Sequence, residues 1–179
     1  GPNEAAGAAE AAAARVGLSD RMDQMAGALS RGLRQRLAIA QAIVHRPAVL
    51  LLDEPAAGLD PQARRDLSDL VLALKKDGMT IVLSSHILAD LERVCDHLVI
   101  LSQAHTQLVG PIDEIVASHR LLVGPRADPA AVARMHNVIR ESHTERQTTL
   151  LVRANGHVYD SSWQVHEVDL EEIVLAYLG

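Results

Sequence analysis

The strongest constraint on the fold of this chain is a short apolar run that ends in two carboxylates. Residues 48–52 read Ala-Val-Leu-Leu-Leu, Pro47 and Pro55 lie on either side, and Asp53-Glu54 follows the run directly. An apolar run of this length between prolines favours a strand buried on both faces over a helix. The sequence therefore predicts a buried strand with acidic residues at its carboxyl end.

The segments after this strand alternate between helical and strand patterns. We expect a helix over residues 62–76, a strand over 80–83, a helix over 87–96 and a strand over 98–101. Such alternation is typical of an α/β fold, in which helices cover both sides of a parallel sheet. Residues 48–119 are accordingly predicted to form one α/β core.

The chain before this core is predicted to be helical. An Ala-rich helix is expected over residues 4–16 and ends at Gly17, and a second helix runs from an N-cap at Ser30 to about His45. Spacings of three and four predict the apolar face of the second helix, made of Leu33, Leu37, Ala40 and Val44. Residues 1–47 are therefore assigned to a helical subdomain.

Residues 120–179 are predicted to form a small α+β appendage. The expected strands lie near 120–123, 147–153 and 157–168, and the expected helices at 129–141 and 169–178. Tyr159 and Trp163 are expected in the appendage's own core. Four histidines suggest a metal or pH-sensing site, although their spacing fits no tight metal motif and also suits scattered surface residues: His136, His143, His157 and His166.

Asp53 and Glu54 are the first candidates for chemistry. In open α/β sheets, ligands bind outside the carboxyl ends of the strands. An Asp at such a position can hold Mg²⁺, and a neighbouring Glu can orient and deprotonate an attacking water. The alternative is an acidic pair that merely begins a loop.

Three further segments contain candidate binding residues. Ser30, Arg31 and Gly32 open a helix, and a helix N-terminus with a glycine suits a phosphate, although an N-cap serine and a turn glycine need no ligand. Asp60 precedes Pro61 and can cap helix 62–76. His86 follows strand 80–83, so we expect it at the same sheet edge as the carboxylates.

These segments together resemble a known family. Leu29-Ser30-Arg31-Gly32-Leu33-Arg34-Gln35-Arg36 resembles the signature motif of ABC ATPases, and Val49-Leu50-Leu51-Leu52-Asp53-Glu54-Pro55 looks like their Walker B strand. Ala57-Gly58-Leu59-Asp60 is similar to the D-loop, and His86 stands where the family has its switch histidine. The resemblance covers roughly residues 10–118. It implies a partial P-loop NTPase (ABC ATPase) core with parallel strands flanked by helices, of which 48–119 is the C-terminal half.

The resemblance also implies a role for each matching residue, with ATP and Mg²⁺ as cofactors. Asp53 would help hold Mg²⁺, Glu54 would be the general base, and His86 would contact the γ-phosphate. Ser30 and Gly32 would cover ATP bound to a second ATPase subunit, Arg31 would lie close to that phosphate, and Asp60 would signal across the head-to-tail dimer. Dimer closure would drive a transmembrane permease subunit.

The sequence departs from the family pattern in two ways. The signature has Arg31 in place of a glycine and Leu33 in place of a glutamine, which predicts a changed nucleotide affinity. No Gly-x-x-x-x-Gly-Lys-Ser/Thr loop occurs among the 179 residues, and this loop cradles the phosphates in the family. We therefore expect these residues alone neither to bind ATP tightly nor to hydrolyse it.

Ser84-Ser85-His86 is more similar to exporter ATPases than to importers, which tend to have Thr-His-Asp. The expected location is cytoplasmic, peripheral on the inner face of the cell membrane. Two alternatives stay open: a soluble ABC ATPase outside transport, and a binding or regulatory module that naturally lacks the phosphate loop. A net charge of −6 and a pI near 5.8 argue against nucleic acid as a partner.

Overall fold

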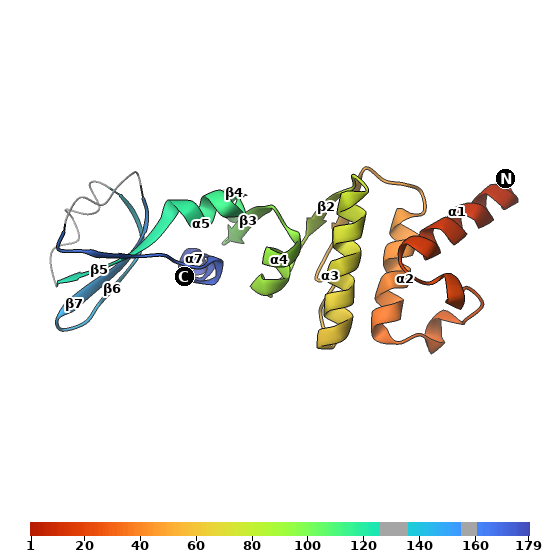
Figure 1. Cartoon of the computed structure of the whole chain (residues 1–179), viewed down its shortest axis with the longest axis horizontal. Coiled ribbons are helices and arrows are strands. Elements are labelled where there is room, and N and C mark those ends of the chain that lie inside the picture. Colours follow the sequence, from red (N-terminus) through yellow and green to blue (C-terminus); the bar gives the residue numbers. More distant parts are fainter. Residues whose placement is uncertain (126–135, 155–160) are drawn as a thin grey trace. The chain divides into compact units, whose positions relative to one another are not determined.

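The computed structural model describes residues 1–125, 136–154 and 161–179. Their contacts divide the chain into two units, Gly1–Val94 and Cys95–Gly179 (Figure 1). The three-part division at residues 47 and 119 stays a prediction.

The first unit begins with helix α1, Pro2–Arg15. Gly17 follows it with a φ of +72°, and the N–H of Leu18 donates to the Ala13 carbonyl over 2.9 Å. A left-handed glycine with this reverse hydrogen bond is a common helix C-terminus, so the predicted end at Gly17 is confirmed. Two short 3-10 helices, η1 (Ser19–Arg21) and η2 (Ala26–Ala28), then lead to the next helix.

Helix α2, Arg31–Ile43, begins at the predicted N-cap. The hydroxyl of Ser30 accepts the N–H of Leu33 over 3.3 Å. The buried positions of the helix are Ile39, Ala40 and Ile43, whereas the predicted apolar residues Leu33, Leu37 and Val44 are only half-buried. The predicted apolar face is therefore correct only at Ala40, and the buried side of the helix is centred on Ile39 and Ile43.

Strands β1 (Val49–Leu52) and β2 (Thr80–Leu83) pair in parallel, with Val49 opposite Thr80 and Leu52 opposite Leu83. The parallel arrangement is confirmed for this pair. The expectation that β1 is buried on both faces is wrong, since Leu50 is buried whereas Val49 is 49% and Leu51 73% exposed. Successive side chains alternate between the two faces, and only one face is covered within the described residues.

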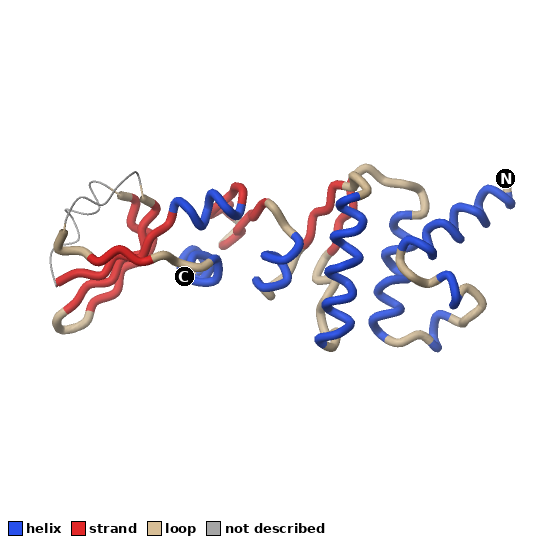
Figure 2. The backbone as a smooth tube through the Cα atoms, viewed as in Figure 1, coloured by secondary structure: helices blue, strands red, loops and turns tan. Residues whose placement is uncertain are grey.

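Helix α3, Pro61–Lys76, covers that face (Figure 2). Its buried apolar residues are those predicted: Leu67, Leu70, Val71 and Leu74. Leu67 and Val71 line a small cavity together with Leu83 of β2. Helix α4, Leu88–Val94, ends the unit and is shorter than its predicted range of 87–96.

The second unit opens with a hairpin of β3 (His97–Ser102) and β4 (His105–Pro111), which pair antiparallel. Gln103 and Ala104 form its two-residue turn with φ values of +50° and +60°, as in a type I′ turn. Among the described residues, the predicted parallel pairing is thus limited to β1 and β2. Helix α5, Ile112–Ser118, follows.

The appendage contains a four-stranded antiparallel sheet in the order β6-β7-β5-β8. The strands are β5 (His119–Pro125), β6 (Asn137–His143), β7 (Gln147–Arg153) and β8 (Gln164–His166). The helix expected at 129–141 is wrong over 137–141, where β6 pairs with β7 across a tight turn at Thr144. Pairing with β7 holds these residues in a strand. Residues 129–135 lie outside the described part.

Trp163 belongs to the core of this sheet, as predicted, and Tyr159 lies outside the described residues. Trp163 packs with Leu122, Leu150 and Val152, all of them buried. The last helix, α7 (Leu170–Leu178), begins at the N-cap Asp169, close to the predicted start. The strand expected at 157–168 is reduced to β8 in the part that is described.

The appendage histidines that the structure describes form no common site. His136 is buried, His143 approaches the hydroxyl of Thr148 at 3.0 Å, and His166 is exposed on β8, whereas His157 lies outside the described residues. No group of three potential metal ligands occurs among the residues described.

Candidate active site

The two carboxylates and the predicted histidine meet at one edge of the β1–β2 pair. Asp53 and Glu54 follow β1, and His86 lies three residues beyond β2. Because the two strands are parallel neighbours, their carboxyl ends lie side by side. The Nδ1 of His86 lies 2.8 Å from Oε2 of Glu54. The structure thus brings an acidic and an imidazole side chain within hydrogen-bond distance.

Ser84 connects the two carboxylate residues, and sequence reasoning gave it no role. Its hydroxyl donates to Oδ1 of Asp53 over 2.5 Å and accepts the N–H of Glu54 over 2.9 Å. The N–H of Ser84 itself donates to the Leu52 carbonyl over 2.9 Å. A signal was present in the sequence, because a hydroxyl residue directly after a strand can reach the end of the neighbouring strand.

The backbone of Glu54 has a left-handed conformation, with a φ of +43°. For a residue with a Cβ, this conformation costs on the order of 1–2 kcal/mol. Strained residues of this kind collect at functional sites, where the surrounding structure holds them. Here the Ser84 hydroxyl holds the Glu54 N–H, and the turn directs the carboxylate toward His86.

The chemistry of this cluster suits a hydrated magnesium ion and a phosphate ester. Carboxylate oxygens are ligands that Mg²⁺ accepts, and Mg²⁺ bound to phosphates keeps several waters. Two adjacent carboxylates therefore fit such an ion without a larger protein cage. The side chain of Glu54 is 39% and that of His86 70% exposed, so water reaches both.

The predicted signature residues lie against other parts of the same unit. Arg31 donates from Nη2 to the Ala57 carbonyl over 2.8 Å. A Cβ on Gly32 would lie 3.1 Å from the Cβ of Ala63, so the start of α2 closely approaches α3. The hydroxyl of Ser30 accepts from Leu33, as described above. These contacts fix the first turn of α2.

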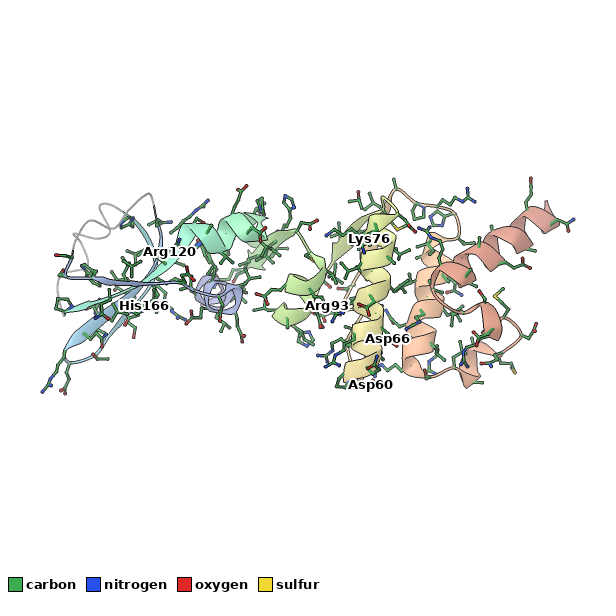
Figure 3. The ribbon with its side chains drawn as sticks, in the orientation of Figure 1. Asp60, Asp66, Lys76, Arg93, Arg120 and His166 are labelled. Atoms are coloured by element: carbon green, nitrogen blue, oxygen red, sulfur yellow. The ribbon has the colours of Figure 1, made fainter. Side chains whose placement is uncertain are left out.

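Asp60 has the capping role that its position suggested. Its Oδ1 accepts the N–H of Gln62 over 3.0 Å and that of Ala63 over 2.9 Å. Figure 3 shows Asp60 at the N-terminal end of α3 and Lys76 at its C-terminal end. The site residues thus form two groups in the structure: Asp53, Glu54, Ser84 and His86 at the strand ends, and Ser30, Arg31, Gly32 and Asp60 around the starts of α2 and α3.

Comparison with known proteins shows which family the chain is similar to. The sequence profile of the ABC transporter family matches residues 3–57. The chain is 41% identical over 105 residues to an uncharacterized ABC transporter ATP-binding protein of Nostoc sp., covering 58% of this chain and 31% of the relative. It is 33% identical over 150 residues to the aliphatic sulfonates import ATP-binding protein SsuB of Shigella flexneri, covering 83% of this chain and 56% of that protein.

A similar structure is that of cbiO1 from Clostridium perfringens, part of the ABC transporter complex cbiONQ. The TM-score is 0.61 at 31% identity, and the match covers 65% of this chain and 47% of that one. The chain therefore spans only between 31% and 56% of the lengths of these proteins. In the described residues, no helix is both long enough and apolar enough to cross a membrane. The profile match, the relatives and the similar structure together support an ABC-type nucleotide-binding domain, and this chain is similar to part of one.

Proposed function

We propose that the protein containing this chain is the ATP-binding and ATP-hydrolysing subunit of an ABC transporter. The observation that carries the proposal is the 2.8 Å contact between Glu54 and His86 beside Asp53, at the ends of two parallel strands. The similarity to an ABC transporter ATP-binding protein and to an import ATP-binding protein supports the same function.

Each residue has a step in this proposal. Asp53 helps to hold Mg²⁺, and the ion, when bound with ATP, neutralises phosphate charge. Glu54 orients a water and takes its proton, since a positioned carboxylate acts as general base within hydrogen-bond reach. His86 contacts the Glu54 carboxylate through Nδ1, and its imidazolium form, which carries an N–H on both ring nitrogens, can also donate from Nε2 to the γ-phosphate.

The partners follow from the two groups of site residues. Ser30, Arg31 and Gly32 at the start of α2 belong to the surface that faces ATP on a second copy, and Asp60 lies beside them. Two copies bind head to tail, and their closure drives a transmembrane permease, so the subunit lies peripherally on the inner face of the membrane.

The direction of transport is proposed to be export. Ser84-Ser85-His86 supports this direction, whereas the import protein of Shigella shows that the relatives include the opposite class. The 179 residues by themselves are proposed to be inactive, because they contain no phosphate-cradling glycine loop.

The test is ATP hydrolysis by the full-length natural subunit and its Glu54→Gln variant. Hydrolysis is expected to fall by about 10²–10⁴-fold, the usual worth of a general base, while ATP binding is retained. Glu92→Gln, an exposed change on α4, is the matched control and should hydrolyse ATP as the wild type does. Wild-type turnover in Glu54→Gln would remove Glu54 from the role.

A further inference from the structure

The side chain of Arg31 contacts the loop that begins at the two carboxylates. We call residues 53–60, which join β1 to α3, the carboxylate loop. The Nη2 of Arg31 donates to the Ala57 carbonyl over 2.8 Å, three residues beyond Glu54. A residue that the sequence placed near a nucleotide is thus hydrogen-bonded within its own chain.

Gly58 provides the space for this contact. A Cβ built on Gly58 would lie 2.6 Å from each of Cζ, Nη1 and Nη2 of Arg31. Equal distances to three atoms of one plane mean that the guanidinium lies flat over Gly58. The φ of Gly58 is +66°, a conformation that residues with a side chain rarely adopt. Any side chain at this position would therefore displace the guanidinium.

The carboxylate loop is built directly on Glu54. The N–H of Ala57 donates to the Glu54 carbonyl over 3.0 Å, and the N–H of Leu59 donates to the Ala56 carbonyl over 3.2 Å. The Ala57 carbonyl lies between these two turns, and Arg31 binds it. A contact that fixes Ala57 thus also restrains the turn that starts at Glu54.

The start of α2 is itself held in place. Gly32 lies against Ala63, where a Cβ on the glycine would be 3.1 Å from that of the alanine. One turn further on, Nη2 of Arg36 lies 3.0 Å from Oδ2 of Asp66 on α3. Arg31 therefore extends from a fixed helix to the carboxylate loop.

We propose that Arg31 is a positioning residue that links the start of α2 to the carboxylate loop and so holds Glu54 in its left-handed conformation. This proposal rests on the proposed function, because positioning Glu54 affects ATP hydrolysis only if Glu54 is the general base. A direct contact between Arg31 and ATP is the competing role.

The first test is hydrogen exchange in the full-length subunit without nucleotide. Arg31→Ala is expected to speed exchange of the Ala57 and Leu59 amides by about threefold to tenfold, the effect of losing one hydrogen bond. Arg65→Ala, which removes an exposed arginine of α3, should leave these amides unchanged. Unchanged exchange in Arg31→Ala would overturn the proposal.

The second test separates positioning from binding through steady-state kinetics. Arg31→Ala is expected to lower kcat about threefold to tenfold with little change in KM for ATP. Arg31→Lys should recover part of kcat, since lysine can donate to Ala57 but cannot lie flat over Gly58. A raised KM with unchanged kcat would show that Arg31 acts by binding ATP and would overturn the proposal.

The two tests fail in distinguishable ways. A wild-type subunit that hydrolyses no ATP would contradict the proposed function, and the exchange measurement would still decide whether Arg31 restrains the loop. Gly58→Ala gives an independent check, because its added Cβ should speed loop exchange less in the Arg31→Ala background than in the wild type. Equal effects in both backgrounds would mean that the two residues do not interact.

Discussion

The Nε2 of His119 lies 3.0 Å from the hydroxyl of Tyr177, and the two rings meet edge to face with centroids 5.7 Å apart. His119 is fully buried where α5 meets β5, and its Nδ1 lies 2.7 Å from the Ile115 carbonyl. The neutral ring donates from Nδ1 to Ile115 and accepts at Nε2 from Tyr177. This pair joins α7 to the start of the antiparallel sheet.

Stability of the second unit is expected to fall on acidification. Burial holds the pKa of His119 below its ordinary value of 6.5, and the charges of Arg153 and Arg120 lower it further, against the carbonyl of Ile115. Below pH 6.5 the unfolded chain gains a proton that the folded one does not, so the free energy of unfolding decreases until the folded pKa is reached. Above pH 6.5 this contribution is constant.

The measurement is urea unfolding followed by Trp163 fluorescence between pH 7.5 and 5, since Trp163 is the single tryptophan and lies in the same unit. Among the residues that the structure describes, the ring also approaches the hydroxyl of Ser118, at 3.3 Å, and a serine hydroxyl does not titrate in this range. His119→Gln should flatten the pH dependence. An unchanged slope in that variant would assign the pH dependence to other groups.

Ser84→Ala is expected to reduce ATP hydrolysis by the full-length subunit about tenfold. The variant loses the hydrogen bonds to the Asp53 carboxylate and the Glu54 N–H, so the strained turn at Glu54 loses a restraint. A hydrogen bond to a charged group contributes roughly 1.5–3 kcal/mol. Ser84→Thr keeps the hydroxyl on a strand end and should retain most activity. Equal losses in both variants would contradict a role for the hydroxyl.

Gly124→Ala is expected to destabilise the appendage by about 1–3 kcal/mol, the usual cost of overpacking a core. The new Cβ would lie 2.6 Å from the Trp163 ring. Urea unfolding should show the loss, and the fluorescence of Trp163 should shift as its ring moves. Gly7→Ala is the control, because a Cβ there meets nothing within 4 Å, and it should leave the urea midpoint of this transition unchanged. A normal midpoint for Gly124→Ala would mean that the ring moves freely.

Local sequence signals were sufficient for the elements around the candidate site. Ser30 and Asp60 cap α2 and α3 because the first-turn N–H groups have no carbonyl partner within the helix, and a short oxygen-bearing side chain can accept from them. The order strand, helix, strand predicts that β1 and β2 are parallel, so that Asp53 and His86 follow strand ends at the same edge. The sequence therefore predicted both the capped helices and the parallel arrangement of the two strands.

Contacts made by tertiary packing were not predictable in this way. The place of Ser84 directly after a strand lets its hydroxyl reach the neighbouring strand end, but the sequence does not indicate that it bonds both Asp53 and Glu54. Nor does the sequence indicate that the Arg31 guanidinium covers Gly58. Residues 137–141 were expected in a helix, but they form a strand because they pair with β7, with Val138 opposite Val152. Exposure of Leu51 depends on what covers the sheet, which the run of leucines does not indicate.

The contrast between the two kinds of strand pairing has a consequence for the order of folding. β3 and β4 meet across the turn at Gln103 and Ala104, so little chain entropy is lost before their first contacts form. β1 and β2 meet only after α3 and its flanking loops have closed between them. Hairpins form within about 1–10 μs, and pairings distant in sequence form more slowly. The Glu54–His86 contact is therefore expected to form late in folding, after the hairpin that follows it in the chain.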